Sequence, residues 1–208
     1  MHCHVKTWGA IHQKSVKSTS VNSALYVLYN VLGKRRGEVN AMEKLIITAC
    51  ICGAEVTKEH NPAVPYTVEE IAKEAKSAYD AGASIIHLHV REDDGTPTQS
   101  KERFEACINA IKEVCPDVII QPSTGGAVGM SNEERLAPTT LRPEMATLDC
   151  GTCNFGGDEI FVNTENMIID FANTMNEYGI KPEIEVFDKG MVDMAIRLHK
   201  KGYIKAPM

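Results

Sequence analysis

The chain has 208 residues, of which 43% are hydrophobic and 24% charged, a composition typical of globular proteins. Its net charge of −6 argues against the basic surface that attracts nucleic acid or an anionic membrane, so neither is expected as a partner. There is no run of about 18 apolar residues, and the lysine-bearing residues 1–20 have no apolar centre, so we expect neither a membrane span nor a secretory signal.

The seven cysteines are an odd number in a chain long enough to form a core without disulfides. Several of them lie inside apolar periodic stretches, where a free thiol packs as a small hydrophobic group. We therefore expect free cysteines and a reducing, cytoplasmic location.

Two unlike regions meet near residue 42. Residues 1–41 show little periodicity, and only residues 24–32 could form two helical turns. We expect residues 1–41 to be an unrelated extension that does not pack on the rest. It is either disordered or the product of a wrongly placed start, and a real extension with a binding role is the alternative.

From residue 42 the pattern alternates between strands and helices. Apolar, β-branched segments predict five strands, at residues 45–51, 84–91, 118–121, 145–149 and 183–187. Helices are predicted after each strand, with a capping box at Thr67 and Glu70 and a capping residue at Asp188. The third connection, at residues 133–136, is long enough for one helical turn only.

This alternation predicts an α/β fold with a parallel sheet, which could be doubly wound or a barrel. Polar residues follow every strand at its carboxyl end, as in barrels, whereas a doubly wound sheet gathers them at one switch point. We therefore expect residues 42–208 to form a partial (β/α)₈ TIM barrel of about five units, since a complete barrel needs about 250 residues.

His87 and His89 stand two residues apart in the expected strand 84–91. Because side chains alternate across a strand, both imidazoles face the same way, while the apolar residues around them face the helices. Two neutral imidazoles in this arrangement can bind one divalent ion, and zinc accepts nitrogen ligands readily. A hydrogen-bonded pair of core histidines is the alternative, but the position near a strand end favours a metal site.

Further polar residues follow other strands. Glu55 comes after the first strand, where its carboxylate could bind a substrate ammonium group or remain a solvated loop acid. The third strand ends in the sequence QPSTGG at residues 121–126, whose paired glycines bring backbone N–H groups close to a carboxylate or an oxyanion. Thr147 places another hydroxyl at the same end of the fourth strand.

Two interpretations stay open in the second half of the chain. Glu185 should face inward, as a carboxylate near the metal or as a partner for Arg91 or a lysine. Cys150 and Cys153 form a C-x-x-C pair, but no second pair accompanies it, which disfavours a redox or zinc site.

Four segments together resemble the β-keto acid cleavage enzymes. They are GAEVTK at 53–58, HLHVR at 87–91, QPSTGG at 121–126 and MATLD at 145–149. The resemblance runs from residue 42 to residue 208 without gaps, and residues 1–41 have no counterpart in the family.

The resemblance implies a zinc-dependent, homo-oligomeric (β/α)₈ barrel. Such an enzyme converts a β-keto acid and acetyl-CoA into acetoacetate and a new acyl-CoA, with 3-keto-5-aminohexanoate from lysine fermentation as the favoured substrate. By match to the family pattern, His87 and His89 would bind zinc. The substrate contacts carried over in the same way are Glu55, Ser123, Gly126 and Thr147.

The family pattern also has an arginine, a third zinc ligand and a catalytic aspartate on a strand that would follow residue 208. No catalytic residue is therefore assigned within the chain, and we expect the 208 residues alone to be an inactive amino-terminal part of such an enzyme. The rival hypotheses are a metal-dependent hydrolase of the amidohydrolase type and a decayed, non-catalytic barrel.

Overall fold

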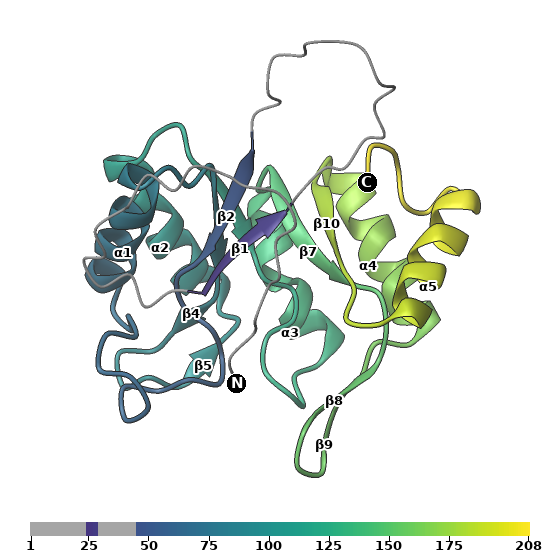
Figure 1. Ribbon diagram of the computed structural model, residues 1–208, viewed down its shortest axis with the longest axis horizontal. Helices are drawn as coiled ribbons and strands as arrows, with labels where there is room; N and C mark the ends of the chain where they lie inside the picture. The colour runs from purple at the N-terminus through teal and green to yellow at the C-terminus, as the bar shows by residue number, and fades with distance from the viewer. Residues whose placement is uncertain (1–23, 29–44) are drawn as a thin grey trace, which may run out of the picture.

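The computed structural model describes the backbone of residues 24–28 and all atoms of residues 45–208 (Figure 1). The larger part alternates strands with helices, which confirms the expected α/β fold. Its main elements are β2 (Ile46–Cys50), α1 (Val68–Asp80), β3 (Ile85–Leu88), α2 (Lys101–Val114), β6 (Ile119–Pro122), α3 (Asn132–Leu136), β7 (Met145–Asp149), α4 (Glu165–Tyr178), β10 (Lys181–Glu185) and α5 (Lys189–Lys200). None of the described helices is long and apolar enough to cross a membrane.

The helices begin where the sequence places capping side chains. Thr67 and Glu70 form the predicted capping box at α1, which satisfies two backbone N–H groups that the first helical turn leaves free. Asp188 accepts a hydrogen bond from the backbone N–H of Met191 and so begins α5. At the other end of α4, Gly179 ends the helix in the left-handed conformation that glycine adopts without steric cost.

The strands pair in parallel as predicted, but in two groups. β2, β3 and β6 pair in sequence order, and β7 pairs with β10. Between the groups, the backbone N–H of Thr124 donates to the Thr147 hydroxyl at 2.9 Å. The described strands do not close into a barrel.

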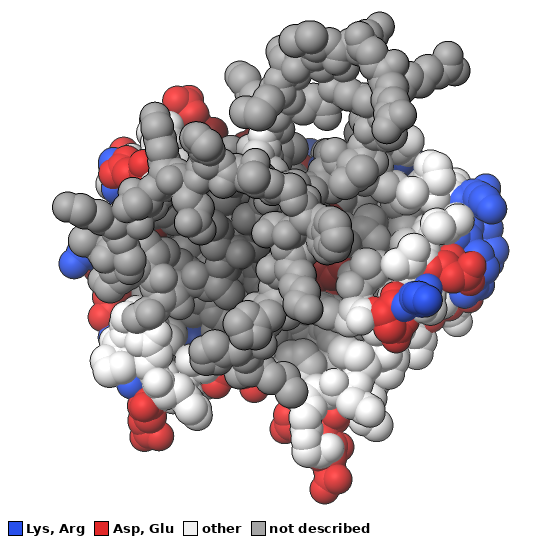
Figure 2. Space-filling model, in the orientation of Figure 1, with Lys and Arg blue, Asp and Glu red and all other residues white. Residues whose placement is uncertain are grey.

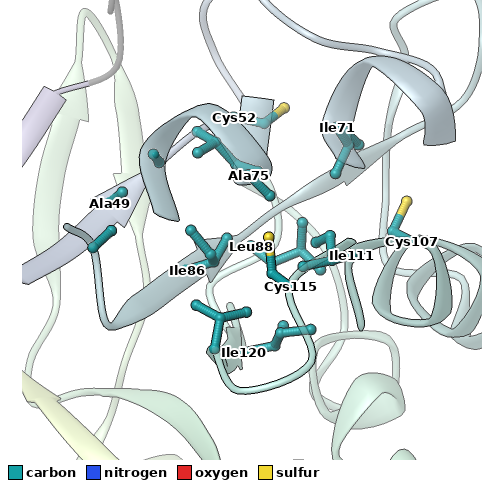
Figure 3. Packing of buried hydrophobic residues seen from close by; sticks show 14 of the residues in the cluster. Ala49, Cys52, Ile71, Ala75, Ile86, Leu88, Cys107, Ile111, Cys115 and Ile120 are labelled. Carbon is teal, nitrogen blue, oxygen red and sulfur yellow. The ribbon is translucent and has the colours of Figure 1, made fainter. Parts of the chain in front are cut away.

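Two hydrophobic clusters hold the helices against the strands. The first cluster fills the space between β2, β3, β6 and the helices α1 and α2, with Ile86, Ile111 and Ile120 among its members (Figure 3). The second cluster joins β7 and β10 to α4 and α5 and includes Leu148 and Leu198. We call these two parts the first and the second region.

Several boundaries differ from the prediction. The strand expected at 84–91 is divided at His89 into β3 and β4 (Val90–Arg91), and β4 pairs with β5 (Pro97–Thr98). The strand expected at 183–187 lies two residues earlier, because β10 pairs with β7 residue for residue up to Glu185 opposite Asp149. Val186 is therefore exposed rather than packed on the helices.

The structure adds two elements that the pattern did not predict. After β7, the chain forms an antiparallel hairpin from β8 (Cys153–Gly156) and β9 (Glu159–Phe161). The third connection contains a 3₁₀ helix, η1 (Ala137–Leu141), directly after the predicted turn. A proline at its second position is compatible with the start of a helix. The five residues are too few to show a helical or strand period in the sequence.

The helical expectation for residues 24–32 is wrong at its start. Residues Ala24–Leu28 form strand β1, which pairs antiparallel with β2 (Figure 1). Contrary to the expectation that the extension stays off the sheet, these five residues cover the outer edge of β2, where unpaired backbone groups would otherwise face solvent. The rest of residues 1–41, including the expected boundary at 41/42, lies outside the described residues.

Candidate active site

The two histidines lie at the carboxyl end of β3, as predicted. Ile86 and Leu88 point into the first hydrophobic cluster, so the alternation of the strand turns His87 and His89 to the opposite side. Their ring centroids lie 5.1 Å apart with the planes tilted by 58°. Burial lowers the pKa of His87, and burial together with the neighbouring His87 and Arg91 lowers the pKa of His89 to about 3. Both rings are therefore neutral near pH 7, the form that binds metals.

Gln121 connects His87 to the second region. This fully buried side chain lies opposite His87 in the parallel pair β3–β6. Its Oε1 lies 3.0 Å from Nδ1 of His87, and its Nε2 donates to a carboxylate oxygen of Glu183 at 2.8 Å. The three side chains thus form one hydrogen-bonded chain across β3, β6 and β10.

The loop after β6 brings the predicted hydroxyl and glycine residues together. Ser123 Oγ accepts the backbone N–H of Gly125 at 3.1 Å, and Thr147 Oγ1 accepts that of Thr124 at 2.9 Å. Both hydroxyls are buried, and each keeps its own proton to donate to an anion. Gly126 has φ +64°, and a Cβ there would lie 2.8 Å from the sulfur of Met130, so this position favours glycine.

Two carboxyl groups meet at the ends of β7 and β10. Asp149 and Glu185 lie opposite each other in the parallel register of β7 and β10, which makes their carboxyl groups neighbours. Burial and the neighbouring Asp149 raise the pKa of Glu185 to about 9, and burial also raises that of Asp149. Two buried carboxyls in contact cannot both ionise, and Arg135, 3.7 Å from Asp149, favours the charge there. Glu185 therefore holds the proton, and its suggested pairing with Arg91 is wrong.

Arg91 instead shapes the loop that carries Glu55. Its guanidinium is buried and donates to the backbone oxygens of Gly53, Val56 and Gly95 at 2.6–2.9 Å. Glu55 itself is exposed on this loop. The structure therefore fixes the loop backbone on both sides of Glu55.

A cavity of about 280 Å³ lies next to the loop that follows Gly126, and neither histidine lines it. Its walls are mostly apolar and come from the loop after Gly126 and from β9, with Arg135 at one side. Among them, Phe161 also stacks on Arg135, whose guanidinium carbon lies 4.7 Å from the ring centre. The hairpin β8–β9 thus forms a wall next to the QPSTGG loop.

The cysteine interpretation from the sequence is consistent with the structure. The six described cysteines are free, and burial raises the pKa of Cys150 to about 12, so this thiol is not a reactive thiolate near pH 7. No group of three or more His, Cys, Asp or Glu suited to a metal occurs among the described residues. Both histidines of the predicted metal-binding pair lie within the described part of the chain.

Sequence reasoning missed the residues that act between elements. The pairings of Gln121 with Glu183 and of Arg135 with Asp149 join residues far apart in the chain. Gln121 lies within the QPSTGG segment, and Asp149 ends a predicted strand, so their positions were visible. Their partners were not, because nothing in a linear pattern tells which side chains meet inside the fold.

Neutral imidazoles, buried hydroxyls and a glycine loop thus gather at the carboxyl ends of parallel strands, as in α/β enzymes that bind small anionic substrates. A family model described as beta-keto acid cleavage enzyme matches residues 44–208. The chain belongs to the β-keto acid cleavage enzyme family.

Relatives of known function are similar over most of the chain. It is 80% identical over 167 residues to the 3-keto-5-aminohexanoate cleavage enzyme of Acetoanaerobium sticklandii, covering 80% of this chain and 61% of that protein. The enzyme of the same name from Fusobacterium nucleatum matches to the same extent. A 3-oxoadipate:acetyl-CoA acetyltransferase of Cupriavidus necator is 40% identical over 159 residues, 76% of this chain and 55% of that protein. The chain therefore spans less than two thirds of the length of these relatives.

One solved structure supports the fold. The apo structure of ObcA superimposes with a TM-score of 0.60 at 23% identity, over 67% of this chain and 33% of that chain. At this identity the likeness concerns the arrangement of strands and helices alone.

Proposed function

We propose that this chain belongs to a zinc-dependent enzyme that cleaves a β-keto acid with acetyl-CoA, giving acetoacetate and a new acyl-CoA. Family membership supports the reaction class, and relatives named for acetyl-CoA transfer support acetyl-CoA as co-substrate. The observation that carries the proposal is the pair of neutral imidazoles next to two buried hydroxyls and a glycine loop.

His87 and His89 fit a zinc site as its nitrogen ligands. Both are neutral and face the same side of one strand, which is the arrangement that two imidazole ligands of one ion require. Bound zinc would supply Lewis-acid polarisation of a ketone oxygen. A third protein ligand is not provided among the described residues.

The loop after β6 is suited to hold the substrate carboxylate. Ser123 and Thr147 each accept one backbone N–H, so their own O–H groups remain as donors. Gly126 lets the backbone approach an anion closely. Because these groups are buried, their hydrogen bonds to an anion are stronger than they would be in water.

Glu55 is the proposed partner of the substrate amino group, which makes 3-keto-5-aminohexanoate the favoured substrate. The names of the two relatives at 80% identity support this choice. Arg91 supports it physically, because its hydrogen bonds fix the backbone on both sides of Glu55.

We also propose that the five units are the first part of a (β/α)₈ barrel. The parallel pairing of the strands in chain order and the likeness to ObcA support this view. A homo-oligomeric assembly and a cytoplasmic location remain predictions. In the view of Figure 2, basic and acidic side chains lie next to each other near α5, and further acidic side chains lie at several separate places.

Zinc binding tests the metal assignment on the 208-residue chain. We expect this chain to bind about one zinc weakly, because the described residues offer only two protein ligands, and a chain completed with the later strands of the family pattern to retain about one zinc. Equilibrium dialysis at saturating zinc measures both, and replacing His87 and His89 by alanine should abolish binding in each. Zinc retained at full stoichiometry in the double variant would contradict the assignment. Replacing exposed His60 by alanine is the matched control.

Substrate binding tests the role of Glu55. Titration calorimetry of the zinc-loaded chain should show tighter binding of 3-keto-5-aminohexanoate than of 3-ketohexanoate, and Glu55→Gln should remove that difference. Equal binding of the two compounds by the unchanged chain would refute the substrate assignment.

We expect no acetoacetate formation by the 208 residues alone, because the described residues offer only two metal ligands. The assay combines the zinc-loaded chain with 3-keto-5-aminohexanoate and acetyl-CoA. Robust turnover would show that a carboxylate within the chain, with Glu185 the first suspect, completes the site.

A further inference from the structure

A chain of hydrogen bonds runs from Glu183 through Gln121 to His87. Gln121 lies on β6 and Glu183 on β10, with β7 between these two strands. In parallel barrels, side chains of alternate strands fill one layer of the interior, and this is the geometry that lets Gln121 reach Glu183. The amide of Gln121 is fully buried, so it has no water to satisfy it.

The chemistry of the three groups fixes the direction of each hydrogen bond. A carboxylate only accepts, so the group of Gln121 that faces Glu183 at 2.8 Å is the NH₂ group. The amide oxygen therefore faces His87 at 3.0 Å. Because this oxygen only accepts, Nδ1 of His87 must carry the ring proton, and Nε2 keeps its lone pair.

We propose that Glu183 and Gln121 are positioning residues that hold His87 in its Nδ1–H tautomer and present Nε2 to a divalent cation. The cation part of this inference rests on the proposed function, whereas the tautomer part stands on the hydrogen bonds alone. A partner on the second ring nitrogen is what fixes the orientation and tautomer of metal-binding histidines in general.

The proposal also explains why a buried glutamine and a half-buried glutamate meet at the junction of the two regions. Gln121 belongs to the strand paired with β3, and Glu183 to the strand paired with β7. The ligand from the first region is thus oriented by a carboxylate from the second. Correct assembly of both regions becomes a condition for metal binding.

The tautomer can be measured without metal. The 208-residue chain is labelled with ¹⁵N-histidine, stripped of metal and studied by long-range ¹H–¹⁵N NMR, with the His87 signals assigned by their loss in His87→Asn. We expect a protonated Nδ1 and an unprotonated Nε2. The opposite tautomer in the unchanged chain would overturn the proposal.

Variants then separate the effect of the hydrogen-bonded chain from Glu183 to His87 from a general loss of packing. Gln121→Met keeps the size of the side chain but removes the acceptor, so His87 should become a mixture of tautomers. Glu183→Leu should do the same by freeing the Gln121 amide, whereas Glu183→Gln can still accept from that amide and should keep the Nδ1–H form. The matched control is Gln99→Met, which removes another buried glutamine, bonded to backbone oxygens of Ser123 and Arg135 and not to His87. If the His87 tautomer stayed unchanged in Gln121→Met, or changed in Gln99→Met, the proposed role of Gln121 and Glu183 would be refuted.

Zinc affinity provides the second readout, by competition with a chelator. Gln121→Met and Glu183→Leu should weaken zinc binding by about 10–100-fold, the usual effect of losing such a partner, and Glu183→Gln by much less. Zinc affinity unchanged in Gln121→Met would overturn the positioning role. If the unchanged chain bound no zinc, the proposed metal site would fail together with the cation part of the inference, and the NMR result would still decide the tautomer.

Discussion

The two regions each enclose one buried arginine, but they neutralise it in different ways. In the first region, Arg91 donates to backbone oxygens and lies over the ring of Tyr66, 5.3 Å from its centre. Arg135, which joins the second region, lies between two aromatic rings and 3.7 Å from the carboxylate of Asp149. The first region thus holds its buried arginine without an opposing charge, whereas the second places the buried carboxylate of Asp149 beside its arginine.

The two regions contribute different chemical groups to the candidate site. The first region supplies neutral imidazoles and a fixed loop backbone, and the second supplies the carboxyl groups of Asp149, Glu183 and Glu185. The neutral imidazoles and the carboxyl group that holds a proton therefore come from two separately packed cores. Four measurements test this division.

Removing the buried arginines should have the largest effect. Arg135→Met leaves the Asp149 carboxylate buried without its counter-charge, so we expect about 3–5 kcal/mol of lost stability in metal-free urea unfolding. Arg91→Met leaves only uncharged backbone oxygens unsatisfied and should cost less, about 1–3 kcal/mol. Asp149→Asn should partly rescue Arg135→Met, and equal losses in both single variants would contradict the proposed difference.

Core truncations should show whether the two regions unfold separately. Ile111→Ala in the first cluster and Leu198→Ala in the second each remove a fully buried side chain and should cost about 2–5 kcal/mol. Because the described strands form two separately paired groups, we expect each variant to lower hydrogen-exchange protection mainly in its own region. Equal loss of protection throughout the chain would show one cooperative unit.

The two regions should respond to pH in opposite directions. His89 has a pKa of about 3 in the folded chain against an ordinary value of 6.5, so the unfolded chain binds one more proton between these values and stability falls as pH drops below 6.5. Glu185 has a pKa of about 9 against 4.5, so the folded chain binds the extra proton and stability falls as pH rises from 4.5 to 9.

Metal-free unfolding across this pH range tests both signs. His89→Asn should reduce the pH dependence of the free energy of unfolding between pH 3 and 6.5 by the equivalent of about one bound proton. Glu185→Gln should reduce it by about the same amount between pH 4.5 and 9. A chain with Glu185→Gln that still lost the same stability between neutral and alkaline pH would show that Glu185 is ionised in the folded state.

Helix caps should give the smallest effect. Thr67 belongs to a capping box whose Glu70 is also bonded to Lys58, whereas Thr164 caps α4 by a single hydrogen bond. Thr67→Ala should therefore cost more than Thr164→Ala, with both near 1 kcal/mol in thermal or urea unfolding. The reverse order would show that the capping box adds nothing in this context.

Local patterns in the sequence were enough to predict the alternation of strands and helices, their caps and the residues at the strand ends. These features are local, because period, capping and turn chemistry act over a few neighbouring residues. His87, His89, Ser123, Gly126 and Thr147 were accordingly found from their places in the pattern. The strand at 24–28 was missed because its short apolar stretch fits a helix as well as a strand, and only its pairing with β2 decides between them.

Which of these residues meet depends on the assembled fold. Glu185 could have faced Arg91, but the register of β10 on β7 places it beside Asp149, and Arg91 uses its donors on backbone oxygens. Gln121 was visible in a motif, yet its link to Glu183 spans 62 residues of sequence. Such contacts depend on strand register and on which side chains share an interior layer, and these are properties of the assembled sheet rather than of any single segment.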